Sequence, residues 1–167
     1  MFIFFKFISS IGIVGISSYL GYLKSKSLAN REYILREMII FLNLVKTEIS
    51  YTYNILPNVF EISRNKLNTG LKEVIGSIAV DMLKGKENIK ENINNLNDIN
   101  RYEKDVFETA LLSLGKSDVD SQVAIINKTT EILESLVVDA KDVKDKNSKM
   151  YKTLGMVTGL IFVIIFI

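Results

Sequence analysis

The residues whose types and spacing come nearest to a chemical motif lie between positions 110 and 129. Gly115-Lys116-Ser117 matches the end of a phosphate-binding P-loop. In that motif a glycine-rich turn follows a β-strand, and its backbone amides hold the phosphate groups. Ala110 stands where the motif needs its first glycine, and the preceding residues have a helical pattern. The sequence therefore argues against nucleotide binding here.

The next residues resemble half of a calcium-binding loop. Asp118-x-Asp120-x-Gln122 has the alternating oxygen ligands of such a loop, but Val123 replaces its turn glycine and Thr129 replaces its bidentate glutamate. A helix start explains the pattern better, because Ser117 or Asp118 would cap the helix and acidic side chains are stabilised near a helix N-terminus.

Five further carboxylates could be imagined as paired acids and bases: Glu131, Glu134, Asp139, Asp142 and Asp145. They alternate with lysines, as on a solvated helix face. The chain has no Cys and no His, which removes thiol nucleophiles, the commonest general base and the usual zinc ligands. We expect no catalytic residue, no metal, no cofactor and no small-molecule substrate. A carboxylate-only enzyme is an alternative that needs two acids with strongly shifted ionisation in one pocket.

Composition narrows the class further. The 167 residues suit one domain, and a net charge of +2 does not indicate a nucleic-acid partner. Charged residues are concentrated between positions 24 and 152, whereas both ends are almost uncharged. Both ends are therefore candidate membrane segments.

The N-terminal candidate covers residues 2–23 and is interrupted only by Lys6. A helix of this length would be about 33 Å long, enough for a hydrocarbon core of about 30 Å. A secretory signal peptide is the alternative. Lys24 and Lys26, directly after the apolar stretch, favour an uncleaved transmembrane helix.

The C-terminal candidate covers residues 153–167 and would be only about 22 Å long. Tyr151 suits the membrane interface, and Lys152 can extend its amine to the headgroups. The alternative is a buried core helix, but residues 160–167 are apolar on every side. We expect a second transmembrane helix.

Basic residues flank both candidate spans on the inner side of the sequence. By the positive-inside rule, residues 24–152 lie in the cytoplasm. The same residues could attract anionic lipid headgroups, but a plain topology signal with no specific lipid site explains them better.

Apolar spacing predicts a series of helices in the middle segment. The first runs from the membrane to about Tyr53, and the second is capped by Asn54, carries Pro57 in its first turn and ends near residues 68–70. Later helices cover residues 71–83 (closed by Gly85), 89–96, 102–114 (closed by Gly115) and 118 onward. The predicted fold is an all-α antiparallel helical bundle flanked by N- and C-terminal transmembrane helices.

Small residues recur in both apolar ends. Gly155 and Gly159 form a GxxxG pattern, and Ser17 and Gly21 form a similar small-xxx-small pair. Such residues allow close packing of membrane helices or self-association. The alternative is that glycine is simply common in membrane helices.

The order of several motifs along the whole chain resembles the stage III sporulation protein AB family. The first helix carries Gly21, Arg31, Arg36 and Glu48-Ile49-Ser50-Tyr51, and the turn carries Leu114-Gly115-Lys116-Ser117-Asp118 with Gln122. The last helix carries Leu154-Gly155 and Gly159-Leu160. One departure is Asn54-Ile55-Leu56, which stands where the family usually has Thr-Pro-Leu.

The resemblance implies a relative of the inner-membrane platform protein of type II secretion and type IV pilus systems. The expected role is a scaffold in the channel between mother cell and forespore, in the outer forespore membrane on the mother-cell side. Its expected partners are the secretion-type ATPase, protein AA, and other channel proteins. The alternative is a lipid-binding or homo-oligomerising membrane signalling module. Leu114, Gly115, Asp118 and Gln122 form a candidate partner interface, or alternatively only a structural turn.

Overall fold

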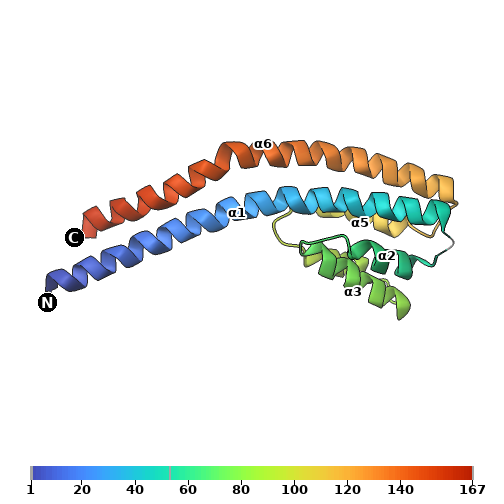
Figure 1. Ribbon diagram of the computed structural model, residues 1–167, viewed down its shortest axis with the longest axis horizontal. Coiled ribbons are helices and arrows are strands. Elements are labelled where there is room, and N and C mark those ends of the chain that lie inside the picture. The colour runs from blue at the N-terminus through green and yellow to red at the C-terminus, as the bar shows by residue number, and fades with distance from the viewer. Residues whose placement is uncertain (1, 53, 167) are drawn as a thin grey trace. The chain divides into compact units, whose positions relative to one another are not determined.

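The computed structural model describes residues 2–52 and 54–166, with side chains from residue 10 to residue 165. This part of the chain forms helices and no strand, so the all-α prediction is confirmed (Figure 1). The helices are α1 (Phe2–Tyr51), α2 (Leu56–Arg64), α3 (Leu71–Leu83), α4 (Ile89–Asn94), α5 (Arg101–Ser113) and α6 (Val119–Phe166). The chain divides into two compact units: a central unit, residues 31–139, and a terminal unit, residues 1–30 and 140–167.

The core of the central unit is built around three phenylalanines from three helices. Phe41 of α1 meets Phe60 of α2 edge to face, with ring centroids 5.1 Å apart, and Phe107 of α5 at 6.0 Å. All three side chains are fully buried. Replacing one such ring by alanine costs about 3–5 kcal/mol, so this cluster is a major part of the stability of the unit.

One face of α1 and one face of α6 complete this core. The buried residues of α1 follow the predicted spacing of three and four: Ile34, Leu35, Met38, Phe41, Leu42 and Val45. On α6 the corresponding residues are Ile126, Leu133 and Val137. Lys46 donates to Asn127 at 3.1 Å and Arg31 to Asp139 at 3.2 Å, so the two helices run antiparallel in this unit.

The start and end of α2 differ from the sequence prediction. Pro57 does lie in the first turn, but Ile55 is the N-cap, no side chain caps the helix, and the prediction for Asn54 is wrong. Asn54 is one residue too early, since a cap must directly precede the first helical residue. The helix also ends at Arg64, before residues 68–70, because the amides of Asn68 and Thr69 bind Glu37 instead of continuing a helix.

The other helix ends follow their local signals. Gly85 after α3 and Gly115 after α5 have φ angles of 69° and 74°, a left-handed conformation that glycine adopts without strain. At the start of α5, Asn100 and Glu103 form a reciprocal capping box. The prediction that a glycine closes α3 is therefore confirmed, whereas α5 ends at its C-cap Leu114, whose backbone is extended (φ −65°, ψ 137°), and Gly115 lies in the turn that follows.

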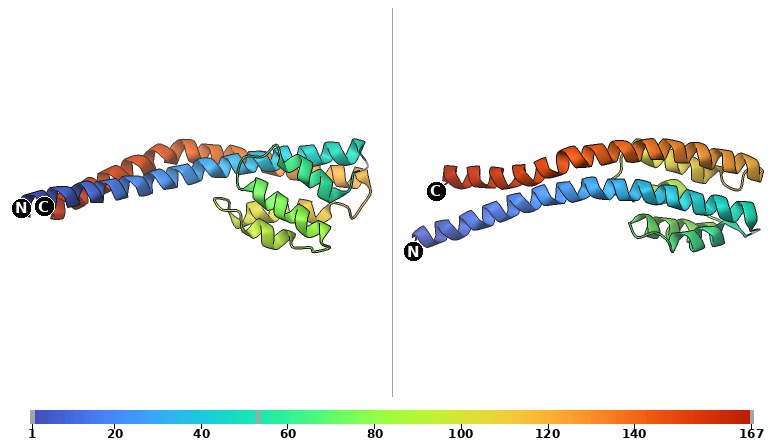
Figure 2. Two further views of the ribbon diagram at one scale, coloured as in Figure 1. Left: turned by 60° about the horizontal axis from the view of Figure 1, so that its bottom comes forward. Right: turned by 45° about the horizontal axis from the view of Figure 1, so that its top comes forward.

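In the terminal unit, the first part of α1 and the last part of α6 run side by side (Figures 1 and 2). Among the helices of the described residues, α6 is the one long and apolar enough to span a membrane. An 18-residue window within it has a mean hydropathy of 1.3, and 6% of this window is buried. It continues without a break through Lys152, so the short apolar end is part of a longer helix. The predicted N-terminal span includes residues 2–9, whose side chains the structure does not describe. Ile167, at the end of the predicted C-terminal span, also lies outside the described residues.

Candidate functional site

The turn between α5 and α6 is held by one buried glutamine. The Gly115 amide donates to Gln122 Oε1 at 2.9 Å, and Gln122 Nε2 donates to the Ser117 carbonyl at 2.7 Å. Leu114 is buried beneath the turn, whereas Lys116 and Ser117 are exposed. The side chain of Gln122 therefore fixes the backbone of an exposed turn. It satisfies the Gly115 amide and the Ser117 carbonyl, which would otherwise bind water.

Asp118 caps α6. Its Oδ1 accepts from the Ser121 amide at 2.9 Å and its Oδ2 from the Ser121 hydroxyl at 2.8 Å. These two hydrogen bonds lower the pKa of the Asp118 carboxyl. The structure thus brings Leu114, Gly115, Asp118 and Gln122 together in one turn, with Asp118 and Gln122 in structural contacts. The turn follows helix α5 and not a strand, so it lacks the setting of a phosphate loop.

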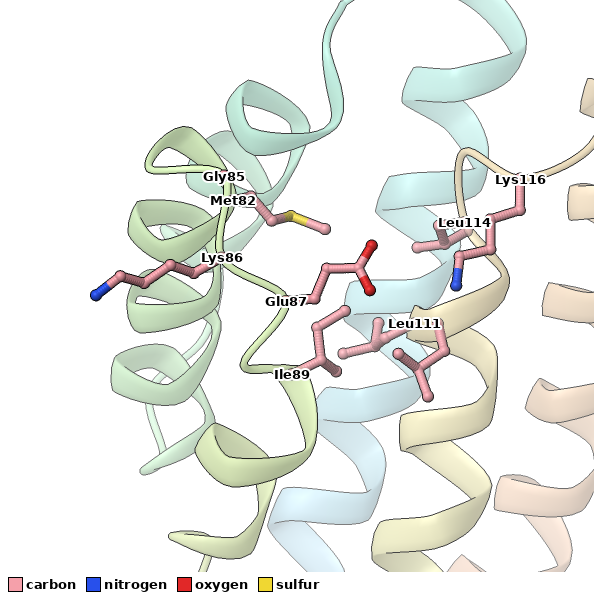
Figure 3. Close-up of a pocket in the computed structure, with 9 residues that line it drawn as sticks. Met82, Gly85, Lys86, Glu87, Ile89, Leu111, Leu114 and Lys116 are labelled. Atoms are coloured by element: carbon pink, nitrogen blue, oxygen red, sulfur yellow. The ribbon is translucent and has the colours of Figure 1, made fainter.

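A cavity of about 240 Å³ lies directly beside this turn (Figure 3). Its apolar lining comes from the end of α3, the start of α4 and the end of α5: Met82, Ile89, Leu111, Leu112 and Leu114. Three charged residues also line it: Lys86, Glu87 and Lys116. The cavity joins the turn to the opposite Gly85 turn, a relation that the sequence did not reveal because the two turns are thirty residues apart.

The four small residues of the terminal unit face one another. Ser17 Oγ donates to the Gly155 carbonyl at 2.6 Å. A Cβ on Gly155 would lie 2.7 Å from the Ser17 carbonyl oxygen, and a Cβ on Gly159 would lie 2.9 Å from Val14 Cα. A Cβ on Gly21 would overlap the Tyr151 carbonyl oxygen. In this structure the small side chains allow two helix backbones to approach closely.

A charged cluster joins three helices of the central unit. Glu103 is 0% exposed; its Oε1 accepts from Arg31 Nε at 2.8 Å and forms an ion pair with Arg31 Nη2 at 2.6 Å. Asp139 on α6 lies 3.2 Å from the same Nη2. Burial lowers the pKa of the Arg31 guanidinium, but the hydrogen bonds and charges of Glu103 and then Asp139 outweigh it and raise that pKa. The cluster ties α1 to α5 and α6.

Sequence reasoning missed the long-range contacts of two buried carboxylates, Glu103 and Glu37. Glu103 was recognisable as a cap from the Asn100-x-x-Glu103 spacing, but its partner Arg31 was not. Glu37 of α1 accepts from the Asn68 amide at 2.7 Å, the Thr69 amide at 3.0 Å and the Thr69 hydroxyl at 2.6 Å. No local pattern around Glu37 predicts these contacts.

The carboxylates along α6 lie on an exposed face or form ion pairs. Asp142 pairs with Lys146 at 2.6 Å and Asp145 with Lys144 at 3.6 Å. Glu131 and Glu134 are exposed. Across the described residues, no group of three or more acidic side chains is arranged to hold a metal ion. These contacts are those of a solvated helix face.

The geometry defines an all-helical protein with a candidate membrane span, a pair of helices closely packed through small residues, and an exposed turn beside an apolar cavity. The chain belongs to the stage III sporulation protein AB family, whose family model matches residues 6–167. The resemblance seen in the sequence is thereby confirmed over almost the whole chain, and with the candidate span it indicates a sporulation protein associated with a membrane. No curated protein and no solved structure matches the chain.

Proposed function

We propose that this protein is a membrane-anchored platform component of a secretion-like channel between mother cell and forespore, and that its cytoplasmic helical domain docks a secretion-type ATPase. The observation that carries the proposal is the family match from residue 6 to residue 167, which includes both apolar ends and the central unit. The protein acts as a scaffold and catalyses no reaction. Its localisation is the outer forespore membrane, with the helical domain on the mother-cell side.

Membrane anchoring in this proposal uses both apolar ends. The close approach at Gly155 and Ser17 supports a packed pair of spanning helices, because small residues let backbones meet in lipid. By the positive-inside rule, Lys24 and Lys26 after the first span and Lys149 and Lys152 before the second support a cytoplasmic location of residues 24–152.

Docking in this proposal uses the exposed turn of the central unit. A binding surface that is already rigid loses little conformational entropy when a partner arrives. The Gln122 contacts and the Asp118 cap supply that rigidity, while Lys116 and Ser117 remain accessible.

Topology is the first test, because a cytosolic ATPase reaches only a cytosolic domain. Since the chain has no Cys, single Cys probes before Met1, at Asn68 and after Ile167 can be labelled with an impermeant maleimide. In non-sporulating cells that express the protein, where the outer face of the membrane meets the medium, we expect the probe at residue 68 to react only after lysis and both end probes to react before it. Labelling of residue 68 in intact cells would exclude docking to a cytosolic ATPase.

The second test is direct association of the full chain, in mild detergent, with the purified ATPase by calorimetry and pull-down. Absence of association would remove docking from the proposal.

The second candidate function, a lipid-binding or oligomerising signalling module, is favoured by an apolar groove of about 540 Å³ in the terminal unit, lined by Ile13, Ile16, Ser17, Leu20, Thr158 and Phe162. Self-association or liposome binding with no ATPase binding would support that alternative.

A further inference from the structure

We propose that the cavity between the Gly85 turn and the Gly115 turn is the docking pocket for one large apolar side chain of the ATPase. The segment that carries this side chain would form backbone hydrogen bonds with Glu87 and Lys116 at the mouth of the pocket. The inference rests on the proposed function and adds to it a site and the chemistry of the occupant.

The size and lining of the cavity fit a single side chain. Its volume is about 240 Å³, and five apolar residues contribute to its wall. Small-molecule sites usually have about 300–1,000 Å³, whereas an apolar cavity of about 150 Å³ already holds a benzene molecule. A Leu, Met or Phe side chain therefore suits this pocket better than a cofactor.

The mouth of the pocket offers one acceptor and one donor. Figure 3 shows Glu87 and Lys116 directed toward the cavity from opposite sides, whereas Lys86 points away from it. Within the described part of the chain, neither the Glu87 nor the Lys116 side chain forms a hydrogen bond or ion pair. A carboxylate accepts from an amide N–H and an ammonium group donates to a carbonyl, so the pair complements the backbone of a peptide segment.

Both turns that bound the pocket are fixed before any partner binds. Gly85 has a φ of 69°, and the Lys86 amide donates to the Asp81 carbonyl at 2.9 Å. On the other side, Gln122 holds Gly115 and Ser117. Binding then requires no folding of the loops, and the apolar side chain gains the free energy of leaving water at a small entropic cost. Central, buried apolar anchors of this kind commonly dominate protein interfaces.

The test compares ATPase binding by the full chain in mild detergent with binding by pocket variants. Glu87→Trp places an indole at the mouth of the cavity, and Lys116→Glu reverses the donor. Both residues are exposed, so neither change removes core packing. Lys128→Glu on α6 is the matched control, because it reverses another exposed lysine that does not line the pocket. We expect each pocket variant to weaken binding at least tenfold and the control to change it less than twofold.

A second measurement identifies contact independently of affinity. A photo-crosslinking amino acid at position 87 should attach to the ATPase, and the same group at position 128 should not. Binding of the ATPase by both pocket variants as tightly as by the unmodified chain would overturn the pocket and leave the proposed function intact. If the unmodified chain does not bind the ATPase at all, both the proposed docking and the pocket are wrong.

Discussion

Replacing Glu103 by glutamine tests whether the buried charge cluster stabilises the central unit. The carboxylate is 0% exposed; its Oε1 accepts from Arg31 Nε and pairs with Arg31 Nη2, while its Oε2 accepts from the Asn100 amide at 2.8 Å. In Glu103→Gln the chain keeps the shape of the side chain but has one oxygen in place of two. Either Arg31 or the Asn100 amide then faces an NH₂ group and loses its acceptor.

The magnitude follows from what Arg31 retains. Breaking a fully buried ion pair costs about 3–5 kcal/mol. The Arg31 side chain is 17% exposed and still has Asp139 at 3.2 Å, so part of its charge stays compensated. Loss of one hydrogen bond to a charged group costs about 1.5–3 kcal/mol, and we expect about 2–3 kcal/mol for Glu103→Gln. At about 4 °C per kcal/mol for a unit of this size, Tm falls by about 8–12 °C.

Thermal unfolding of the full chain in mild detergent, followed by far-UV circular dichroism, measures this change. The matched control is Asp105→Asn, which breaks an exposed pair with Arg101 and should cost at most about 0.5 kcal/mol. In a double-mutant cycle, Arg31→Gln combined with Glu103→Gln should destabilise less than the sum of the two single changes by about 1 kcal/mol or more. A Glu103→Gln variant that melts within about 2 °C of the unmodified chain, with additive effects, would refute the role of the cluster.

Three further changes test other parts of the structure. Gly115→Ala should lower the Tm of the full chain more than Gly85→Ala. Both positions have positive φ, which costs a non-glycine residue about 1–2 kcal/mol. Of the two, only a Cβ at Gly115 would meet another side chain, Leu56 Cδ1 at 2.8 Å. Cys residues introduced at Ser25 and Ser148, whose hydroxyls are in contact, should cross-link on oxidation. Gly155→Leu should reduce this cross-linking. Gly12→Leu should not, because nothing lies within 4 Å of a Cβ at Gly12. The Asp118 pKa is lowered by folding, so its carboxylate contributes stability that is present above the ordinary value of 3.8 and is lost as pH falls through the lowered pKa. The Tm difference between the unmodified chain and Asp118→Asn should therefore be larger at pH 7 than near pH 2, and an unchanged difference would contradict this assignment.

The parts of the fold that the sequence predicted are those with local signals. Gly85 closes α3 because its positive φ turns the chain out of the helix, and Gly115 accepts the positive φ of the turn after α5. Asp118 caps α6 because its carboxylate reaches the Ser121 amide three residues ahead. Apolar spacing on α1 predicted the buried face that includes Met38 and Leu42. Each of these signals involves residues within one or two helical turns of one another.

The parts that the sequence did not predict depend on contacts between distant residues. Helix α2 ends at Arg64 because Glu37, about thirty positions earlier, binds the amides of Asn68 and Thr69. Likewise Arg31 meets Glu103 only because the helices that carry them pack together. A carboxylate on a helix looks the same in the sequence whether it faces water or a neighbouring turn, so periodicity alone could not separate Glu37 from the exposed Glu131.

These polar contacts also bear on why the cavity can be a binding site. A buried polar side chain must satisfy its hydrogen bonds, and Glu37, Glu103 and Gln122 each do so by accepting from backbone amides in the connections between helices. The connections between helices are thereby fixed by specific side chains and not by close packing alone. A wall fixed in this way can border a cavity without collapsing into it. Of these three contacts, the Gln122 contact borders the cavity, because it holds Gly115 between the lining residues Leu114 and Lys116. Gln122→Ala leaves the Gly115 amide without its acceptor. We therefore expect it to increase the mobility of the turn beside the pocket at temperatures below the unfolding of the helices.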